Sequence, residues 1–517
     1  MPTAQNQAGL QTRSVVSSFI FTVANGSPRV ALFRRSDKVS TYHHCLAPVA
    51  GHIQNNESPV AAAWREIEEE TTLTTSHLEL WRQGKPFTFD DSSVGRQWTV
   101  YPFGFCLRTA KDDAIRINWE HEGWSWYDPN EVSDDEQFGG VPRLSESLRR
   151  VWFEMDMNPA AAGALRSGLE ELKTDHRSGS HELTSIAVKS FRDILVHLRS
   201  DRKWWETARM AAWHLWKNGR ESMGSATLNA LLGVLADIDD LKDLSLDDEC
   251  AMDRVLGRID HHLEVRRQMP ACIKDSFVAY LQANGSRDTQ TLSILTLSAS
   301  STIRDSILDA FSSLPMPNLD LRILESRPLF EGASMASSLL SAFESKFPAA
   351  TGRHLRLTVY TDASAALAAT NVEFVLLGAD RLSSSGWVSN KTGSLPAVLS
   401  AKHVSPSCKV LVFSGLEKVA EPGAEHEHEP EENDYREVMI PWIECSVRGV
   451  NILEEGIRGI PPKTANCHVQ VKNIYFEWVP SEMIDGYICE KGMVSAAAIR
   501  KCAQEVRENS RAYFDSL

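Results

Sequence analysis

The cysteines of this 517-residue chain lack any paired spacing. Nine are scattered along it, and none stands in a CxxC arrangement. Structural zinc sites are commonly built from such pairs, and small secreted domains need an even set of bridged cysteines, so both classes are excluded. Dispersed, odd-numbered thiols are typical of the reducing cytosol or nucleus, and we expect a cytoplasmic protein.

Long apolar runs are also missing. No stretch approaches the ~18 apolar residues that indicate a membrane-spanning helix, so no membrane association is expected. The opening residues, MPTAQNQAGLQTRSVV, have no basic segment followed by an apolar one, which argues against a secretory signal. Residues 1–14 are polar, and we expect them to be disordered.

Positive charge is scarce. Lys and Arg number 54 against 69 Asp and Glu, giving a formal net charge of −15. Because phosphate backbones attract basic surfaces, nucleic acid is not expected as a partner. Small phosphorylated ligands are compatible with this charge, since they need only a local cluster of Arg, Lys and backbone N–H groups.

The composition that remains is that of a soluble protein with several domains. Hydrophobic residues make up 42% and charged residues 24%, and the length favours two or three domains. Residues 15–143 mix strand-like segments with one clear helix, 144–181 form a helical connector and linker, and 182–290 are helical almost throughout. Over 291–517, short apolar runs such as LSILTLS, LDLRILE and KVLVFSG alternate with helical segments. This alternation predicts βαβ units and a parallel sheet.

One short N-terminal segment, GHIQNNESPVAAAWREIEEETTL, concentrates carboxylates. Ser58 followed by Pro59 predicts the start of a helix that runs to about Glu70. Glu66, Glu69 and Glu70 then lie at i, i+3 and i+4 on one face, where like charges repel. A divalent cation such as Mg²⁺ removes that repulsion and keeps waters for a phosphate substrate. On clustering alone, a solvated Glu-rich helix face is the competing interpretation.

The spacing of the segment favours the metal site. Gly51, then Glu57, then the run that begins at Arg65-Glu66 resembles the Nudix box, and the resemblance extends over about residues 15–135. Nudix proteins are α/β/α sandwiches that hydrolyse a nucleoside diphosphate linked to another group. The resemblance implies that Glu66, Glu69 and Glu70 hold Mg²⁺ (or Mn²⁺) and that Arg65 orients one of these carboxylates. The bound metal would neutralise the diphosphate and activate a water for attack on phosphorus.

The segment departs from the Nudix pattern at its end. Where the pattern has Gly after the last Glu pair, this chain has Thr71 and Thr72. Gly allows a left-handed helix end, whereas β-branched Thr resists it, so we expect the helix to end differently. Further along, Glu120 or Glu122 could supply an extra ligand or the base, and a surface loop explains them equally well.

Polar residues also follow the strands expected in the C-terminal region. They are Ser300, Ser301, Arg327, Asp380, Asn390 and Lys391. The carboxyl ends of parallel strands meet at one edge of a sheet, where ligands bind, so this set indicates a sugar-phosphate site. Hydroxyl residues at a helix start bind anions in some proteins and simply cap the helix in others.

The stretches ILTLSASST, ESRPLFEG, GADRLSSSGWVSNKTGS and FEWVPSEMIDGYICEKG resemble a known family. It joins the α, β and δ subunits of translation initiation factor 2B to methylthioribose-1-phosphate isomerase and ribose-1,5-bisphosphate isomerase. The resemblance covers about residues 182–517. It implies a helical subdomain followed by a Rossmann-like domain, and a homo-oligomer assembled through the C-terminal domain.

The isomerases of that family pair a Cys at the end of the first strand with the Asp of the GAD motif. Asp380 is present here, but the Cys position is Ser298, a far weaker acid that needs a partner base. The phosphate loop of the isomerases is also missing, and Arg220 is the nearest candidate phosphate ligand. Three alternatives stay open for this region: an isomerase that uses Asp380, a sugar-phosphate or nucleotide sensor, and an assembly module.

Together, the two resemblances predict a Mg²⁺-dependent hydrolase of a nucleoside or ribosyl diphosphate compound, fused to a ribose-phosphate-binding domain. Conversion of phosphoribosyl pyrophosphate to ribose 1,5-bisphosphate is one such case. A bifunctional enzyme that also isomerises an aldose 1-phosphate is one alternative. A non-catalytic regulatory or assembly protein like initiation factor 2B is the other.

Overall fold

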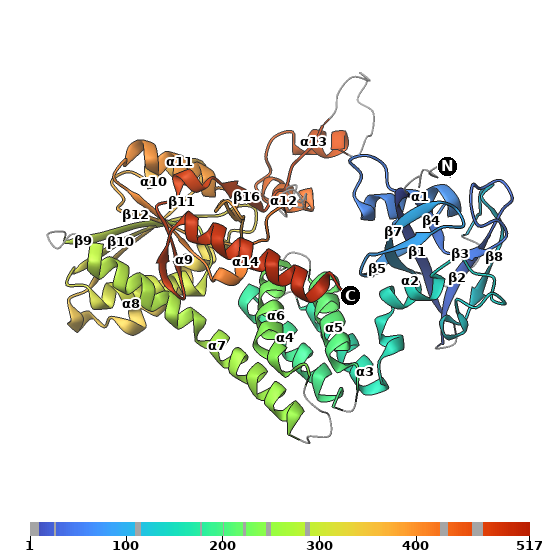
Figure 1. Ribbon diagram of the computed structural model, residues 1–517. Coiled ribbons are helices and arrows are strands. Elements are labelled where there is room, and N and C mark those ends of the chain that lie inside the picture. Colours follow the sequence, from blue (N-terminus) through green and yellow to red (C-terminus); the bar gives the residue numbers. More distant parts are fainter. Residues whose placement is uncertain are drawn as a thin grey trace, which may run out of the picture.

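The chain folds into a strand-rich N-terminal part, a helical middle and a C-terminal α/β part (Figure 1). The computed structural model describes residues 10–24, 27–108, 115–175, 178–199, 201–220, 224–243, 250–284, 290–423, 433–457 and 469–517. Residues 1–9 of the segment expected to be disordered lie outside this description. For residues 11–14 the expectation is wrong, because they belong to the first strand and pair with a distant strand of the sheet.

The N-terminal sheet has eight strands. They are β1 (Gln11–Ala24), β2 (Ser27–Arg35), β3 (Leu46–Ala47), β4 (Val49–His52), β5 (Leu78–Gln83), β6 (Phe87–Asp91), β7 (Arg96–Leu107) and β8 (His121–Tyr127). The order is β3-β2-β1-β7-β5, with β4 on β1, β6 on β7 and β8 on β2. β1 and β7 pair in parallel, from Gln11 opposite Arg96 to Phe21 opposite Cys106.

One helix covers each face of this sheet. α1 (Pro59–Thr71) packs on the face that carries Val16 and Ile20, and α2 (Leu144–Val151) packs on the face that carries Phe19 and Phe21. Successive side chains of a strand point to opposite faces of the sheet, so alternate residues of β1 pack in two separate hydrophobic cores. The predicted α/β/α sandwich is confirmed, and α2 belongs to it by packing.

The end of α1 differs from our expectation. Thr72 takes the left-handed conformation, with φ 62° and ψ 8°, and its N–H donates to the carbonyl of Glu68. The prediction that Thr would force another ending is wrong. Surrounding contacts hold the strained residue, because Leu73 is fully buried and the N–H of Arg116 donates to the carbonyl of Thr71 at 3.0 Å.

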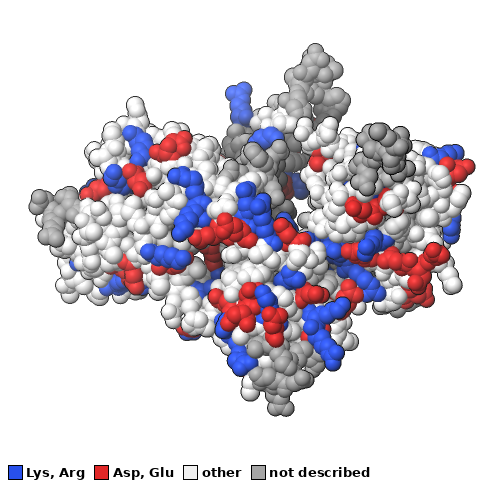
Figure 2. Space-filling model, in the orientation of Figure 1, with Lys and Arg blue, Asp and Glu red and all other residues white. Residues whose placement is uncertain are grey.

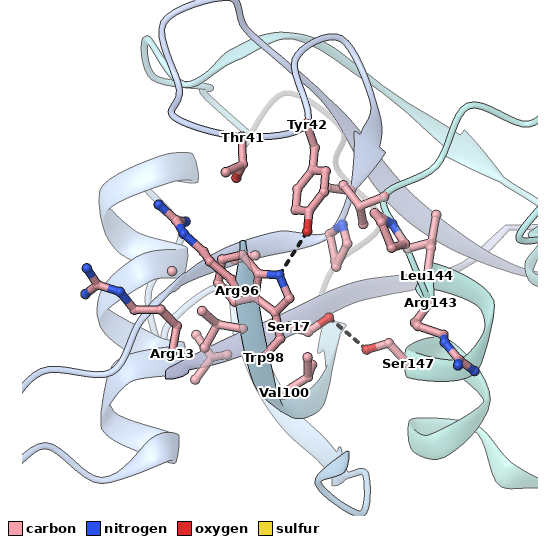
Figure 3. A pocket seen from close by; sticks show the side chains of 18 of the residues that line it. Arg13, Ser17, Thr41, Tyr42, Arg96, Trp98, Val100, Arg143, Leu144 and Ser147 are labelled. Carbon is pink, nitrogen blue, oxygen red and sulfur yellow. Dashed lines mark hydrogen bonds between the residues drawn. The ribbon is translucent and has the colours of Figure 1, made fainter. Parts of the chain in front are cut away.

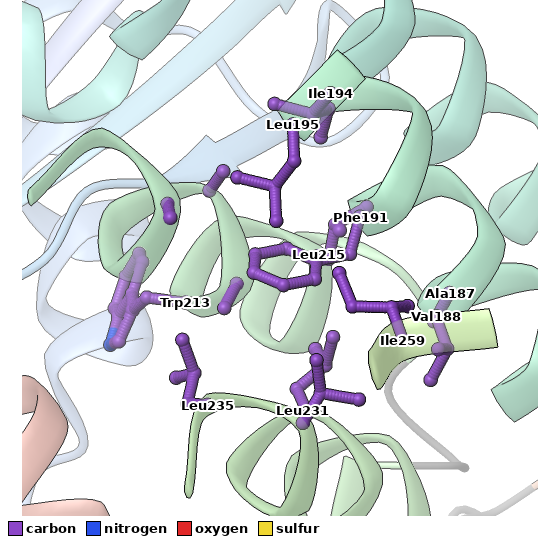
Figure 4. Packing of buried hydrophobic residues seen from close by; sticks show 14 of the residues in the cluster. Ala187, Val188, Phe191, Ile194, Leu195, Trp213, Leu215, Leu231, Leu235 and Ile259 are labelled. Carbon is purple, nitrogen blue, oxygen red and sulfur yellow. The ribbon is translucent and has the colours of Figure 1, made fainter. Parts of the chain in front are cut away.

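The middle of the chain is an all-helical bundle. Its helices are α3 (Pro159–Thr174), α4 (Ser180–Val196), α5 (Trp204–Asn218), α6 (Gly224–Ile238) and α7 (Ala251–Asn284). Figure 4 shows its core, where Phe191 and Leu195 of α4 meet Leu215 of α5, Leu231 of α6 and Ile259 of α7. Each such side chain contributes roughly 2 kcal/mol when fully buried.

The bundle is joined to the sandwich at β5. The side chain of Asn218 accepts from the N–H of Gln83 at 2.7 Å and donates to its carbonyl at 2.9 Å. Beside it, Arg82 of β5 forms a buried ion pair with Glu154. These contacts connect the N-terminal sheet to the helical bundle, and those of Asn218 join it directly to α5.

The C-terminal sheet has seven strands in the order β11-β10-β9-β12-β15-β17-β18. They are β9 (Thr291–Thr296), β10 (Asn318–Leu324), β11 (His354–Tyr360), β12 (Phe374–Gly378), β15 (Lys409–Phe413), β17 (Gly486–Cys489) and β18 (Gly492–Val494). Every pair is parallel except β17 with β18, which confirms the predicted parallel sheet. A small sheet of β13 (Arg381–Leu382), β14 (Val388–Lys391) and β16 (Phe476–Val479) lies beyond β12.

Seven helices accompany this sheet in the described part of the chain. They are α8 (Ser301–Ser313), α9 (Glu331–Lys346), α10 (Ala365–Ala368), α11 (Ser394–Val404), α12 (Tyr435–Glu444), α13 (Val450–Ile457) and α14 (Ala496–Phe514). α7 links the two cores, since Ile259 lies in the bundle core and Phe277 in the sheet core. α14 returns to the bundle (Figure 1). There, Phe514 packs on Trp216.

Charges of both signs are mixed on the face that Figure 2 shows, without an extended basic area among the residues coloured there. None of the helices described is long and apolar enough to cross a membrane.

Candidate active site

Arg65 organises the carboxylates of α1. Its Nε and Nη2 donate to the two carboxylate oxygens of Glu57 at 2.8 and 2.9 Å, and its Nη1 donates to Glu66 at 2.7 Å. Nη1 also lies 3.4 Å from Glu69. Hydrogen bonds from Arg65 lower the pKa of Glu57 to about 2, and the pairing with Glu57 raises the pKa of Arg65. Arg65 therefore stands where a residue that orients these carboxylates must stand.

The three predicted metal ligands differ in exposure. Glu66 and Glu70 are buried, whereas the side chain of Glu69 is 58% exposed. Gly51 of β4 lies against Glu66, because a Cβ built on Gly51 would come within 1.9 Å of the Glu66 carboxyl carbon. The glycine of the motif is thus needed to leave room for a carboxylate.

Glu70 has a partner that the sequence did not indicate. Its Oε2 lies 2.5 Å from Nε2 of His121, and both side chains are buried. Burial, with Glu120 and Glu66 nearby, raises the pKa of Glu70, while burial and then Arg35 lower the pKa of His121 to about 4. Only the inward position of His121 on β8 could have indicated this contact, because the two residues are 51 positions apart in the chain.

Of the two further candidates, Glu120 and Glu122, only the first comes near the carboxylate cluster. Glu120 is close enough to raise the pKa of Glu66 and Glu70. Glu122 instead pairs with His44 at 2.7 Å on an exposed surface. The structure thus separates two residues that the sequence left equivalent.

The carboxylate oxygens of this cluster are the type of ligand that a divalent cation such as Mg²⁺ binds. In the described part of the chain, no three Asp, Glu, His or Cys side chains converge on one point as they stand. However, the buried Oε1 of Glu70 has no hydrogen-bond partner there. The charge of Glu120 helps to raise the pKa of both Glu66 and Glu70, and the charge of Glu66 adds to the rise at Glu70. A cation bound by these oxygens would relieve the repulsion, and Mg²⁺ prefers such ligands. Glu66 and Glu70, with Glu69 turned inward, are the residues that would hold it.

A cavity of about 380 Å³ adjoins the carboxylates on the α2 side of the sheet. Ala50 and Gly51 line it at the end nearest Glu66, and Arg35, which interacts with Glu70 and Glu120, lines it too. Figure 3 shows Tyr42 and Trp98 meeting across it and Ser17 of β1 bonded to Ser147 of α2. A substrate in this cavity could present one end to the carboxylate cluster.

In the C-terminal part, the structure brings Ser298 and Asn390 together. The Ser298 hydroxyl accepts from the N–H of Gly378 at 2.8 Å and from Nδ2 of Asn390 at 3.2 Å. Nδ2 of Asn390 also donates to Ser394 at 2.9 Å. Both Ser298 and Asn390 are buried, so this hydroxyl connects the ends of β9, β12 and β14.

Asp380 and Lys391 lie beside that connection. Burial raises the pKa of Asp380, and Lys418 and Lys391 oppose the rise. Nζ of Lys391 is 3.0 Å from Glu331, at the start of α9. Lys418, whose Nζ donates to the carbonyl of Ala379 at 2.6 Å, is a cation that sequence reasoning missed. It follows β15, so the sheet-edge rule could have found it.

The remaining predicted residues contribute less directly. Ser300 caps α8 by accepting from the N–H of Ile303, and Ser301 is the first residue of that helix. The backbone N–H of Arg327 donates to Asp362 at 2.8 Å, and its guanidinium lies over the ring of Phe330. Arg220 instead donates to a carbonyl in the bundle, that of Asp175. No described contact joins Arg220 to Ser298 or Asp380.

Comparison with known proteins agrees with this division of the chain. The model of the initiation factor 2 subunit family matches residues 222–496, more than half of the 517 residues. The chain belongs to the initiation factor 2 subunit family. Ahead of that match, residues 13–151 match the NUDIX domain model, so this family member carries a Nudix domain at its N-terminal side.

Curated relatives of this family member are methylthioribose-1-phosphate isomerases. The protein from Marinobacter nauticus is 32% identical over 173 residues, 33% of this chain and 41% of the relative. The one from Magnetococcus marinus is 29% identical over 201 residues, 38% and 49% of the two chains. The match therefore spans less than half the length of these relatives.

Two solved structures of low identity match parts of this chain. The eIF2B beta structure from Chaetomium thermophilum covers 69% of this chain and 95% of its own, with 14% identity and a TM-score of 0.45. A C. elegans Ap4A hydrolase covers 27% of this chain and 93% of its own, with 19% identity and a TM-score of 0.23.

Proposed function

We propose that this protein is a Mg²⁺-dependent (or Mn²⁺-dependent) Nudix hydrolase of a nucleoside or ribosyl diphosphate compound. Its C-terminal domain binds a ribose phosphate. One observation carries the hydrolase proposal: Arg65 gathers Glu57, Glu66 and Glu69 beside buried Glu70, next to a cavity that Arg35 lines. This arrangement supports the roles expected from the motif.

The residues of this site divide the work. Glu66, Glu69 and Glu70 would hold the divalent cation, which when bound neutralises the diphosphate and activates water. Arg65 fixes the carboxylate of Glu66, and Arg35 faces the oxygens of the diphosphate from the cavity side. Water attacks one phosphorus, the bridging P–O bond breaks, and a nearby carboxylate such as Glu120 takes the proton.

The test is turnover of a diphosphate panel with product identification by mass. Nucleoside diphosphate sugars, dinucleotide polyphosphates and phosphoribosyl pyrophosphate are incubated with the whole chain and Mg²⁺ or Mn²⁺. We expect at least one compound to be cleaved, and Glu69→Gln to reduce that cleavage by about 100-fold or more. Unchanged turnover in Glu69→Gln overturns the assignment. The same variant should also bind Mn²⁺ more weakly, as measured by electron paramagnetic resonance of the ion.

For the C-terminal domain, ligand binding is the better-supported function. Asp380, Lys391 and Lys418 lie at the carboxyl edge of the parallel sheet, where phosphorylated ligands bind. The Ser298 hydroxyl already accepts two hydrogen bonds, and among the described residues it donates none to a base. We expect ribose 1,5-bisphosphate or a related sugar phosphate to bind, and Asp380→Asn and Lys391→Gln to weaken that binding.

Isomerisation is the second candidate for this domain. The raised pKa of Asp380 favours it, since a protonated carboxyl can donate to a sugar carbonyl. Turnover that Asp380→Asn abolishes and Ser298→Cys increases would establish it. If the wild type binds the sugar phosphate, but neither it nor Asp380→Asn nor Ser298→Cys isomerises the compound, the domain is a sensor. No binding at all, together with co-purification of translation factors, would favour the regulatory or assembly alternative.

We also propose a cytoplasmic homo-oligomer that forms through the C-terminal domain. Helices α12 and α13 and the turn between them expose large apolar side chains, namely Ile440, Ile443, Val447, Ile452 and Leu453. Exposed apolar patches commonly mark interfaces. Light scattering should show more than one chain, and Ile452→Asp should shift the mass toward a single chain.

A further inference from the structure

Two arginines at the cavity beside the Nudix carboxylates lack an acidic partner. Arg13 of β1 and Arg96 of β7 both line this cavity, and neither forms an ion pair or a side-chain hydrogen bond with any described residue. The other two arginines of the lining are engaged, since Arg143 bonds Glu146 and Arg35 donates to the carbonyl of Thr41. No Asp or Glu is among the residues that line this cavity. In a chain of net charge −15, such a cavity is built to receive anions.

The sheet holds the two arginines next to each other. In the parallel pairing of β1 with β7, Arg13 is opposite Trp98, and Arg96 is two residues before Trp98 on the same face. The guanidinium of Arg96 lies over the Trp98 ring, 5.2 Å from its centroid. Both guanidinium groups extend to the same side of the cavity in Figure 3. Asp91 is opposite Arg96 in the sheet, but its carboxylate accepts from Tyr42 and Ser93.

The arginine pair lies apart from the site of hydrolysis. Glu66 lies against Gly51, and Gly51 is opposite Val16 of β1. Arg13 is three residues from Val16 along the same strand, which corresponds to about 10 Å. At this backbone separation, the carboxylates and the arginine pair mark two ends of the cavity, so the pair is placed to bind a second anionic group of the same molecule.

Aromatic surface fills the space between the two charged ends. Phe87 and Phe89 of β6 stack on each other at 6.0 Å, and Phe89 is opposite Trp98. The indole N–H of Trp98 donates to the Tyr42 hydroxyl at 2.9 Å, and that hydroxyl donates to Asp91 at 2.7 Å. These bonds fix the rings before a ligand arrives, and rigid aromatic walls suit a planar base.

We propose that Arg13 and Arg96 form a second anion subsite, and that the substrate is a nucleoside diphosphate compound carrying an additional phosphate monoester. The diphosphate lies at the carboxylates, the base lies on the aromatic wall, and the extra phosphate binds the two guanidinium groups. This inference rests on the proposed hydrolase function. It disfavours phosphoribosyl pyrophosphate, which has the extra phosphate and lacks a base.

Three probes separate these features. ADP-ribose has the base without the extra phosphate, ADP-ribose 2′-phosphate has both, and phosphoribosyl pyrophosphate has only the phosphate. For the whole chain with Mg²⁺ we expect kcat/KM for ADP-ribose 2′-phosphate to exceed the other two by about tenfold or more. Equal values for the two ADP-ribose compounds, or a preference for phosphoribosyl pyrophosphate, overturn the proposal.

Substitutions assign the preference to the arginines. Arg13→Gln and Arg96→Gln should each reduce the advantage of the 2′-phosphate through KM, and the double variant should remove it while ADP-ribose changes less than about threefold. Arg13→Lys and Arg96→Lys retain the positive charge, so these variants should keep part of the preference for the 2′-phosphate. Arg29→Gln, at an exposed arginine of β2, is the control. If both compounds weaken equally, the arginines bind the diphosphate itself and the second subsite is refuted.

A binding measurement keeps this inference separate from hydrolysis. Without metal, calorimetric titration should show adenosine 2′,5′-bisphosphate binding at least about tenfold tighter than 5′-AMP. Arg13→Gln should reduce the difference, and the double variant should remove it. If this difference appears while neither the three probes nor any compound of the diphosphate panel is cleaved, the hydrolase proposal fails and the anion subsite stands. If compounds are cleaved and no difference appears, the subsite fails and the hydrolase stands.

Discussion

Glu57 and Arg65 form a bidentate ion pair across eight residues of the chain, with Nε to Oε1 at 2.8 Å and Nη2 to Oε2 at 2.9 Å. The pair fixes the guanidinium so that its third nitrogen reaches Glu66. Glu57 thus positions Arg65, and Arg65 positions a proposed metal ligand. Such supporting partners affect metal affinity and activity nearly as much as the ligands themselves.

Arg65→Lys tests this arrangement. A lysine keeps the charge but cannot hold Glu57 through two parallel bonds while reaching Glu66. We expect kcat to fall by about 10- to 100-fold and Mn²⁺ to bind more weakly, with an unchanged circular dichroism spectrum. Arg108→Lys, in an exposed pair with Glu79, should leave both unchanged. Wild-type activity in Arg65→Lys would show that the pair is structural only.

Gly51→Ala should displace a carboxylate directly. The new Cβ would lie 1.9 Å from the carboxyl carbon of Glu66, so Glu66 must move. We expect hydrolysis and Mn²⁺ affinity to fall by tenfold or more, roughly the effect of misplacing a catalytic group by 1 Å. Gly123→Ala is the matched control, because nothing lies within 4 Å of its Cβ. Equal activity in the two variants contradicts the placement of Glu66.

Thr72→Gly should stabilise the protein. Thr72 is held at φ 62°, where a non-Gly residue costs about 1–2 kcal/mol and a glycine costs little. We expect the free energy of unfolding of the Nudix domain, measured by thermal melting, to rise by about 1 kcal/mol. Activity should stay unchanged. Thr75→Gly, at an exposed residue of the next turn, should give no gain. A loss of stability in Thr72→Gly would mean that contacts of the Thr side chain outweigh the backbone strain.

His214 should make stability depend on pH. It is fully buried against Phe153, and its Nδ1 accepts from Asn218 at 2.9 Å. Burial, and then the charge of Arg82, lower the pKa of His214 well below 6.5. Below pH 6.5 the unfolded chain therefore binds a proton that the folded chain does not, and stability falls as pH falls, by up to about 1.4 kcal/mol per pH unit.

The variant His214→Phe isolates the contribution of His214 to the dependence of the unfolding free energy on pH. Between pH 6.5 and 5, denaturant unfolding of His214→Phe should lose less stability per pH unit than the wild type. His354→Gln, at an exposed histidine, should follow the wild type. Parallel curves for His214→Phe and the wild type would place the pH dependence elsewhere, for example at buried His121.

Much of this fold could be predicted from local sequence. Ser58 caps α1 by accepting from the N–H of Ala61 at 3.2 Å, as its place before Pro59 predicts. The apolar runs of the C-terminal region became the parallel strands β9, β10, β12 and β15. Caps and periodicity involve residues within a few positions of one another, so the sequence alone determined these elements, the parallel sheet and the carboxylate set of α1. The sandwich was expected only from the resemblance to Nudix proteins.

Tertiary structure decided the rest. Thr72 is left-handed because Leu73 must be buried, and Glu70 meets His121 only because β8 returns beside β2. Arg13 and Arg96 share one cavity because β1 and β7 pair in parallel across more than 80 residues of chain. Strand register and burial depend on contacts between distant segments, and a residue's immediate neighbours carry no record of those contacts.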